Sequence, residues 1–127
     1  MENCIFCKIV DGKVPCVKIW EDEESLAMLD INPAHQGHTL VIPKKHIDYL
    51  FDLNDEEYRR LMSNAKNVAA KIRKGLKSEK VGIIVEGFEV RHAHVHLIPI
   101  NKQGDVIMPR TGFKEERELE EVAKRIR

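Results

Sequence analysis

The chain has 127 residues, 33% of them charged, and its 21 basic and 21 acidic side chains give a formal net charge of zero. This balance excludes the strong overall electrostatic field with which many proteins attract nucleic acids or membrane surfaces. The length suits a single domain, residues 1–127, with a real hydrophobic core. No apolar run approaches the ~20 residues of a membrane helix, and the N-terminus does not resemble a secretion signal. We therefore expect a cytoplasmic protein with reduced cysteines and no nucleic-acid or membrane partner.

The first feature along the chain is a Cys-x-x-Cys pair, Cys4 and Cys7, in what we predict to be a short helical knuckle. Such a pair fits a redox motif, ordinary packing or half of a zinc site. A thioredoxin-like redox motif follows a strand, whereas only three residues precede Cys4. We favour the zinc half-site, which needs two further ligands from elsewhere in the chain.

The next segments alternate between apolar and polar residues. Residues 17–21 and 25–29 are predicted to form a hairpin, and residues 38–43 a third strand. Asp30 begins the loop between them and could accept hydrogen bonds from a ligand. Apolar residues at helical spacing predict a long helix over residues 54–76, with Asn54 as its N-cap.

The second half of the chain adds two strands and a helix. Residues 81–85 are apolar and branched enough to predict a central strand, and residues 91–100 form the next strand. An amphipathic helix is expected around residues 115–126. Strands joined by tight turns predict an antiparallel sheet, with the long helix packed on one face, and hence an α+β fold.

Three histidines, His92, His94 and His96, alternate with apolar residues in the strand predicted over 91–100. Successive side chains of an extended chain point to opposite faces, so the histidines should share one face. The intervening residues should point into the core against the long helix. A purely structural strand needs no histidine, whereas imidazole can bind metals, attack substrates or transfer protons near neutral pH. We therefore expect chemistry on the histidine face.

Three functions fit such a face. The histidines could hold a catalytic metal for hydrolysis, an imidazole could attack phosphorus and form a phosphohistidine, or the protein could be a zinc-stabilised interaction module without catalysis. Counting ligands favours a structural zinc site combined with catalytic histidines, because His46 and His92 can complete Cys4 and Cys7 to a closed tetrahedral site. A zinc ion with four protein ligands is structural. His94 and His96 would then be free for chemistry.

Residues 37–46, followed by 92–98 with their His-x-His-x-His pattern, closely resemble the histidine triad (HIT) family. Residues 4–9 and 29–33 resemble the bacterial and archaeal members of its Hint-like branch. The resemblance implies a five-stranded antiparallel sheet and a homodimer. It also implies a nucleotide hydrolase or transferase that acts on purine nucleoside phosphoramidates or on dinucleoside polyphosphates.

The same resemblance assigns roles to individual residues. His94 becomes the nucleophile that accepts the nucleotide, His96 contacts the phosphate and assists proton transfer, and His38 supports both from the neighbouring strand. Asp30 would bind the ribose hydroxyls. The implied apolar wall of the base pocket consists of Ile5, Phe6, Ile9 and Ile31. The implied structural zinc ligands are Cys4, Cys7, His46 and His92.

The chain departs from the family pattern just before the histidines. The family has an asparagine and a glycine-rich segment that contact the nucleotide phosphate, whereas this chain has the shorter run 84–89. Glu89 and the backbone of Val90 are the candidates left to serve there. Arg91 stands where the family has an apolar residue, and Ile100 where it commonly has arginine after proline. Strand parity points Arg91 away from the histidine face, so we assign it no phosphate contact, and the choice of substrate stays open.

Overall fold

The structure is a computed structural model that describes residues 3–107 and 109–127. Five strands form one sheet in the order β1-β2-β3-β5-β4, and all neighbouring strands are antiparallel. The predicted α+β fold is confirmed. The strands are β1 (Lys18–Glu21), β2 (Ser25–Leu29), β3 (Thr39–Pro43), β4 (Lys80–Ile84) and β5 (Val95–Ile100).

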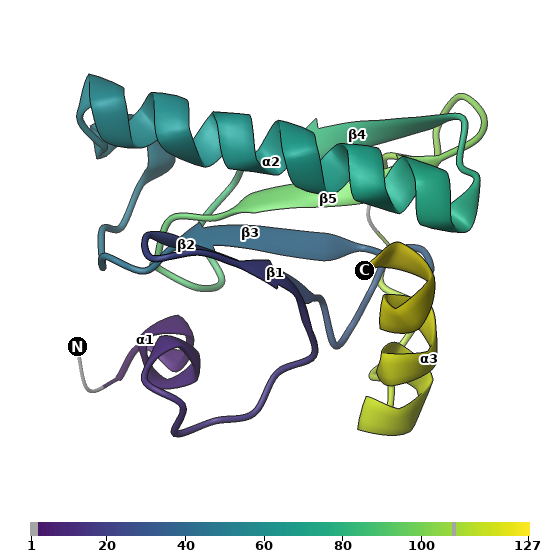
Figure 1. Ribbon diagram of the computed structural model, residues 1–127, viewed down its shortest axis with the longest axis horizontal. Helices are drawn as coiled ribbons and strands as arrows, with labels where there is room; N and C mark the ends of the chain where they lie inside the picture. Colours follow the sequence, from purple (N-terminus) through teal and green to yellow (C-terminus); the bar gives the residue numbers. More distant parts are fainter. Residues whose placement is uncertain (1–2, 108) are drawn as a thin grey trace.

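The helices lie on different sides of this sheet (Figure 1). The long helix α2 (Asp55–Leu76) runs along one face, and the short helix α1 (Ile5–Val10) lies on the other side. Helix α3 (Glu116–Ile126) packs against α2 and β1 at one end of the molecule. A short 3-10 turn, Leu50–Asp52, precedes α2. Over residues 3–107 and 109–127, no helix combines the length and the apolarity that crossing a membrane requires.

Helix α2 begins as the sequence pattern predicts. The side chain of Asn54 accepts a hydrogen bond from the Glu57 amide at 2.8 Å, and the Glu57 carboxylate accepts one from the Asn54 amide at 3.3 Å. This capping box satisfies two amides that the helix itself leaves unpaired. Near its other end, a Cβ atom at Gly75 would lie 1.8 Å from the Arg125 carbonyl oxygen. A glycine is therefore required where α2 meets the end of α3.

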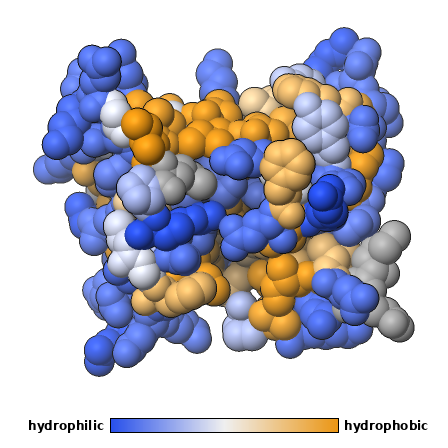
Figure 2. All heavy atoms as spheres, turned by 180° about the vertical axis from the view of Figure 1, so that it is seen from behind, coloured by the Kyte–Doolittle hydropathy of each residue, from blue (hydrophilic) through white to orange (hydrophobic). Residues whose placement is uncertain are grey.

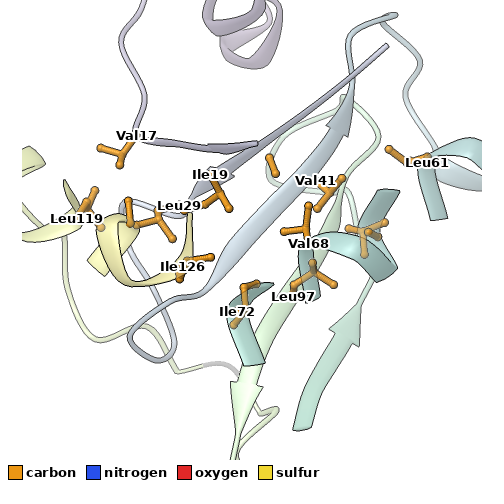
Figure 3. Close-up of a cluster of buried hydrophobic side chains, with 14 of the residues drawn as sticks. Val17, Ile19, Leu29, Val41, Leu61, Val68, Ile72, Leu97, Leu119 and Ile126 are labelled. Carbon is orange, nitrogen blue, oxygen red and sulfur yellow. The ribbon is translucent and has the colours of Figure 1, made fainter. Parts of the chain in front are cut away.

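The two faces of the sheet bury two separate clusters of apolar side chains. Val95 and Leu97 of β5 pack with the buried face of α2, as alternation along the strand predicts. Figure 3 shows Leu97 beside Val68 and Ile72 of α2. Each such fully buried side chain contributes roughly 1.5–3 kcal/mol relative to an exposed one. The cluster on the opposite face fixes α1 against the sheet. It consists of Phe6, Leu26, Met28, Leu40 and Ile42.

Two predictions about the strands are corrected. Strand β5 begins at Val95 rather than at residue 91, because the preceding segment bonds differently: the Ala93 amide donates to the Ile47 carbonyl at 2.6 Å. Only His96 of the three histidines therefore lies within the strand. The other correction concerns β4, which pairs only with β5 within the described part of the chain and forms an edge. Its branched residues suggested burial on both faces, yet Ile83 is 52% exposed.

Candidate active site and metal centre

A cavity of about 460 Å³ opens on the α1 side of the sheet. We call it the triad cavity, because His94 and His96 both line it. All the residues predicted to bind substrate lie in its wall. These are Ile5, Phe6, Ile9, Asp30, Ile31 and Glu89.

His94 is buried, and its ring is held from two sides. Its Nδ1 donates a hydrogen bond to the backbone carbonyl of His92 at 2.7 Å. The Phe6 ring packs edge-on against it, with the ring centroids 5.2 Å apart. A carbonyl oxygen can only accept, so Nδ1 must carry the proton. In neutral His94 the unshared electron pair therefore resides on Nε2, the atom that a nucleophilic role requires.

His38 and His96 form a fixed pair behind this nucleophile. Burial lowers the pKa of His38 to about 4, although the Asp30 carboxylate opposes this shift, and burial with the neighbouring histidines lowers the pKa of His96 to about 3. Both rings are therefore neutral near pH 7. The Ala34 amide donates to His38 Nδ1 at 3.0 Å, which leaves the proton of His38 on Nε2. This Nε2 lies 2.9 Å from His96 Nδ1 and donates to it. His96 consequently carries its own proton on Nε2.

Asp30 has both carboxylate oxygens engaged. Oδ1 accepts from the Asn32 amide at 2.8 Å, and Oδ2 accepts from Arg110 Nη1 at 2.6 Å. Oδ2 also lies 3.5 Å from His38 Nε2. The Asp30 side chain is only 9% exposed. The predicted ribose ligand is thus in the cavity but covered by an arginine.

The four predicted zinc ligands come together at the other end of the histidine segment. Their ligand atoms, Sγ of the two cysteines and Nδ1 of the two histidines, lie within 4.8 Å of one another. Three of the separations are 3.3 Å for Cys4–His92, 3.6 Å for Cys7–His92 and 3.3 Å for Cys7–His46. Tetrahedral zinc with ordinary Zn–S and Zn–N bonds spaces such ligands about 3.6 Å apart. The geometry fits zinc with no open position.

The protonation chemistry of this cluster agrees with a metal. His92 Nε2 donates to the Pro43 carbonyl at 2.7 Å, so its Nδ1 lone pair faces the cysteines. A backbone carbonyl in this position is the usual support of a metal-binding histidine. Burial and the adjacent Cys4 raise the pKa of the Cys7 thiol to about 11. A bound cation would offset the cost of two neighbouring thiolates.

A second set of potential metal ligands, Asp30, His38 and His96, lies beside the triad cavity among the described residues. This set is less suited to a metal ion, because His38 already donates a hydrogen bond to His96 and Arg110 already donates one to Asp30. A cation would have to displace both interactions. The catalytic-metal alternative is therefore the weaker interpretation of the histidines.

Sequence analysis assigned no role to several cavity residues, among them Phe88, Arg110 and Phe113. Phe88 and Phe113 are each 76% exposed and stand at the rim of an apolar wall. Arg110 and Phe113 lie in the irregular segment before α3, which runs alongside the Asp30 loop. The Thr111 amide donates to the Pro33 carbonyl at 2.9 Å, and the Lys114 amide to the Ile31 carbonyl at 2.8 Å. No sequence pattern predicts that these two distant segments lie side by side.

Comparison with known proteins shows the family of the chain. Residues 11–103 match the model of the HIT domain. An uncharacterized HIT-like protein of Methanocaldococcus jannaschii is 39% identical over 98% of this chain and 98% of its own. The adenosine 5'-monophosphoramidase of Schizosaccharomyces pombe is 45% identical over 76% of this chain and 74% of its own. A zinc-bound histidine triad family protein from Mycobacterium smegmatis is 32% identical, with a TM-score of 0.78, over 97% of this chain and 94% of its own.

The fold, the paired histidines and these matches define a nucleotide-processing class of protein. The chain belongs to the HIT family. Nucleotide hydrolysis is the activity that its named relatives support, and the cysteine–histidine cluster suggests zinc.

Proposed function

We propose that this protein is a zinc-containing hydrolase of purine nucleoside phosphoramidates, such as AMP linked to an amine or to lysine. The reaction passes through a nucleotide covalently attached to His94. The observation that carries the proposal is the proton arrangement of the triad: Nε2 of neutral His94 has a free electron pair, whereas Nε2 of His96 bears a hydrogen. A nucleophile and a hydrogen-bond donor thus line one cavity.

In the first step, His94 Nε2 forms a bond to the α-phosphorus and the bond to the leaving amine breaks. The hydrogen bond from Nδ1 to the His92 carbonyl stabilises the positive charge that develops on the ring. In the second step, water attacks phosphorus, loses a proton and releases His94. The products are the nucleoside monophosphate and the free amine.

His96 is assigned to the phosphate, through its Nε2–H. A donor aimed at a phosphoryl oxygen stabilises the charge that grows there in the transition state. The sequence predicted an additional role in proton transfer. The neutral pair holds no surplus proton, because His96 Nδ1 accepts from His38 and His38 Nδ1 accepts from a backbone amide. We therefore assign the proton of the leaving amine to solvent water.

The apolar wall formed by Ile5, Phe6, Ile9 and Ile31 is proposed to take the purine base, and Asp30 the ribose. The Glu89 side chain is 87% exposed, so its carboxylate stays largely hydrated and adds little to the binding of a substrate. The zinc site, with Cys4, Cys7, His46 and His92 as ligands, supplies no chemistry in the reaction. Its role is to fix α1 and the His92 backbone beneath the nucleophile.

A substrate panel tests this proposal. The purified protein is given an adenosine phosphoramidate and a dinucleoside polyphosphate, and release of AMP is followed by chromatography. We expect kcat/KM for the phosphoramidate to exceed that for the polyphosphate by ~10-fold or more, because the triad cavity has a single permanent cation among its described lining residues. Preference for the polyphosphate would support the alternative substrate class. Nucleotide binding without turnover of either would support the non-catalytic zinc-stabilised module.

We further propose a cytoplasmic homodimer. Three observations support pairing of two copies near β4: this strand is an edge, Ile83 and Ile107 are 52% and 67% exposed, and hydrophobic surface gathers along the upper part of the molecule seen from behind (Figure 2). An exposed apolar edge strand favours association. Light scattering at micromolar concentration should give twice the chain mass. A monomer would contradict the proposal.

A further inference from the structure

The charge balance of the triad cavity poses a problem for a nucleotide. Three carboxylates, Asp30, Glu86 and Glu89, line it, and a phosphate would bring further negative charge. Arg110 is the only lysine or arginine among the described residues in the wall. A bound phosphate needs a cation or strong donors to offset its loss of hydration. Among the described wall residues, Arg110 is therefore the cation that could offset the charge of a phosphate.

Arg110 is also the group that covers the ribose-binding candidate. Its Nη1 donates to Asp30 Oδ2 at 2.6 Å and to the Asn32 carbonyl at 2.8 Å. Arg110 Nη2 lies 3.9 Å from Glu89 Oε2, which is beyond hydrogen-bond distance. The guanidinium thus makes its two described hydrogen bonds through one nitrogen. Its other donors make no hydrogen bond to the part of the chain that the structure describes, and they can be offered to an anion.

The charge of Arg110 acts on the histidines as well. Besides burial, which is the main cause, it contributes to lowering the pKa of both His38 and His96. Arg110 therefore lies close enough to the triad for a phosphate bound at the histidines to attract it. Its side chain is 27% exposed, so it has room to turn within the cavity.

We propose that Arg110 exchanges partners when a nucleotide binds. In the free protein the Arg110 guanidinium is hydrogen-bonded to the Asp30 carboxylate. The ribose hydroxyls take its place on the carboxylate, and Arg110 moves to the substrate phosphate, where it replaces the polar contacts missing from the segment before the histidines. The inference rests on the proposed function for the location of ribose and phosphate. It makes Arg110 a specificity-determining residue that favours phosphorylated ligands over plain nucleosides.

The exchange predicts opposite effects on two ligands. In Arg110→Gln, adenosine should bind several-fold more tightly, because it no longer has to displace a charged partner from Asp30. AMP should bind ~10-fold or more weakly, because it loses a charge-assisted hydrogen bond. Arg110→Lys should recover part of the AMP affinity. Isothermal titration calorimetry gives both dissociation constants, and Arg117→Gln, at an exposed arginine of α3, is the matched control.

Each outcome decides the inference. If Arg110→Gln weakens the binding of adenosine and of AMP equally, Arg110 only orients Asp30. If it changes neither affinity, Arg110 takes no part in ligand binding. Either result overturns the exchange. If the unmodified protein fails to bind AMP, the proposed nucleotide function falls together with the inference. If the unmodified protein binds AMP and cleaves a phosphoramidate while Arg110→Gln keeps the ratio of the two dissociation constants, only the inference falls.

Discussion

Replacement of His94 by glutamine is expected to lower kcat for an adenosine phosphoramidate by ~10⁴-fold or more, since the residue would supply the atom that bonds to phosphorus. Glutamine is similar in size and retains an N–H donor for the His92 carbonyl, so the fold and AMP binding should persist. Steady-state kinetics and calorimetry measure the two effects separately.

The matched control is His35→Gln. His35 does not line the triad cavity and contacts the Asp105 carbonyl instead, so turnover should stay within a few-fold of the unmodified protein. Unchanged turnover in His94→Gln would contradict covalent catalysis by this residue. Loss of both turnover and AMP binding would point to a structural rather than a chemical role.

Removal of the zinc ligands should have the largest effect on stability. We expect Cys4→Ser/Cys7→Ser to contain almost no zinc and to melt roughly 10 °C lower, because the metal ties α1 to the sheet. Metal analysis and thermal unfolding measure these effects. Cys16→Ser is the control, because Cys16 does not belong to the cluster of metal-type ligands. Its metal content should equal that of the unmodified protein.

The same variant distinguishes the role of the metal. The His92 carbonyl orients the His94 ring, and the His92 ring is itself a candidate zinc ligand. Loss of the metal should therefore make the position of His94 less well defined and also lower the stability of the fold. Activity and stability should then decline together. Chelation that abolishes activity in a protein with unchanged melting would favour a catalytic metal held by the histidines. A metal-free protein of full stability would refute the cysteine–histidine site.

Sequence analysis succeeded where local rules govern the structure. Alternation predicted that Val95 and Leu97 pack against α2, and ligand chemistry predicted one cluster of Cys4, Cys7, His46 and His92; the structure has both. Spacing alone could not predict that β5 starts at Val95, because the preceding residues bond to the distant Pro43 and Ile47 carbonyls.

The other gaps have the same physical origin. The edge position of β4 depends on strand order, which composition does not encode. Arg110 meets Asp30 only because the segment before α3 runs beside a loop from the first third of the chain. Side chains in irregular segments acquire their partners through tertiary packing. Arg110 and Phe113, both in the irregular segment before α3, are accordingly among the cavity residues that the sequence left unassigned.

Trapping of the covalent intermediate tests the central claim most directly. The protein is mixed with an adenosine phosphoramidate, quenched in base within the first turnover, digested and analysed by mass spectrometry. Base is chosen because a phosphorus–nitrogen bond to histidine is labile in acid. We predict a peptide carrying one adenylyl group on His94, which disappears in His94→Gln. Full turnover without an adduct on His94 in the unmodified protein, or an adduct on another residue, would contradict the mechanism.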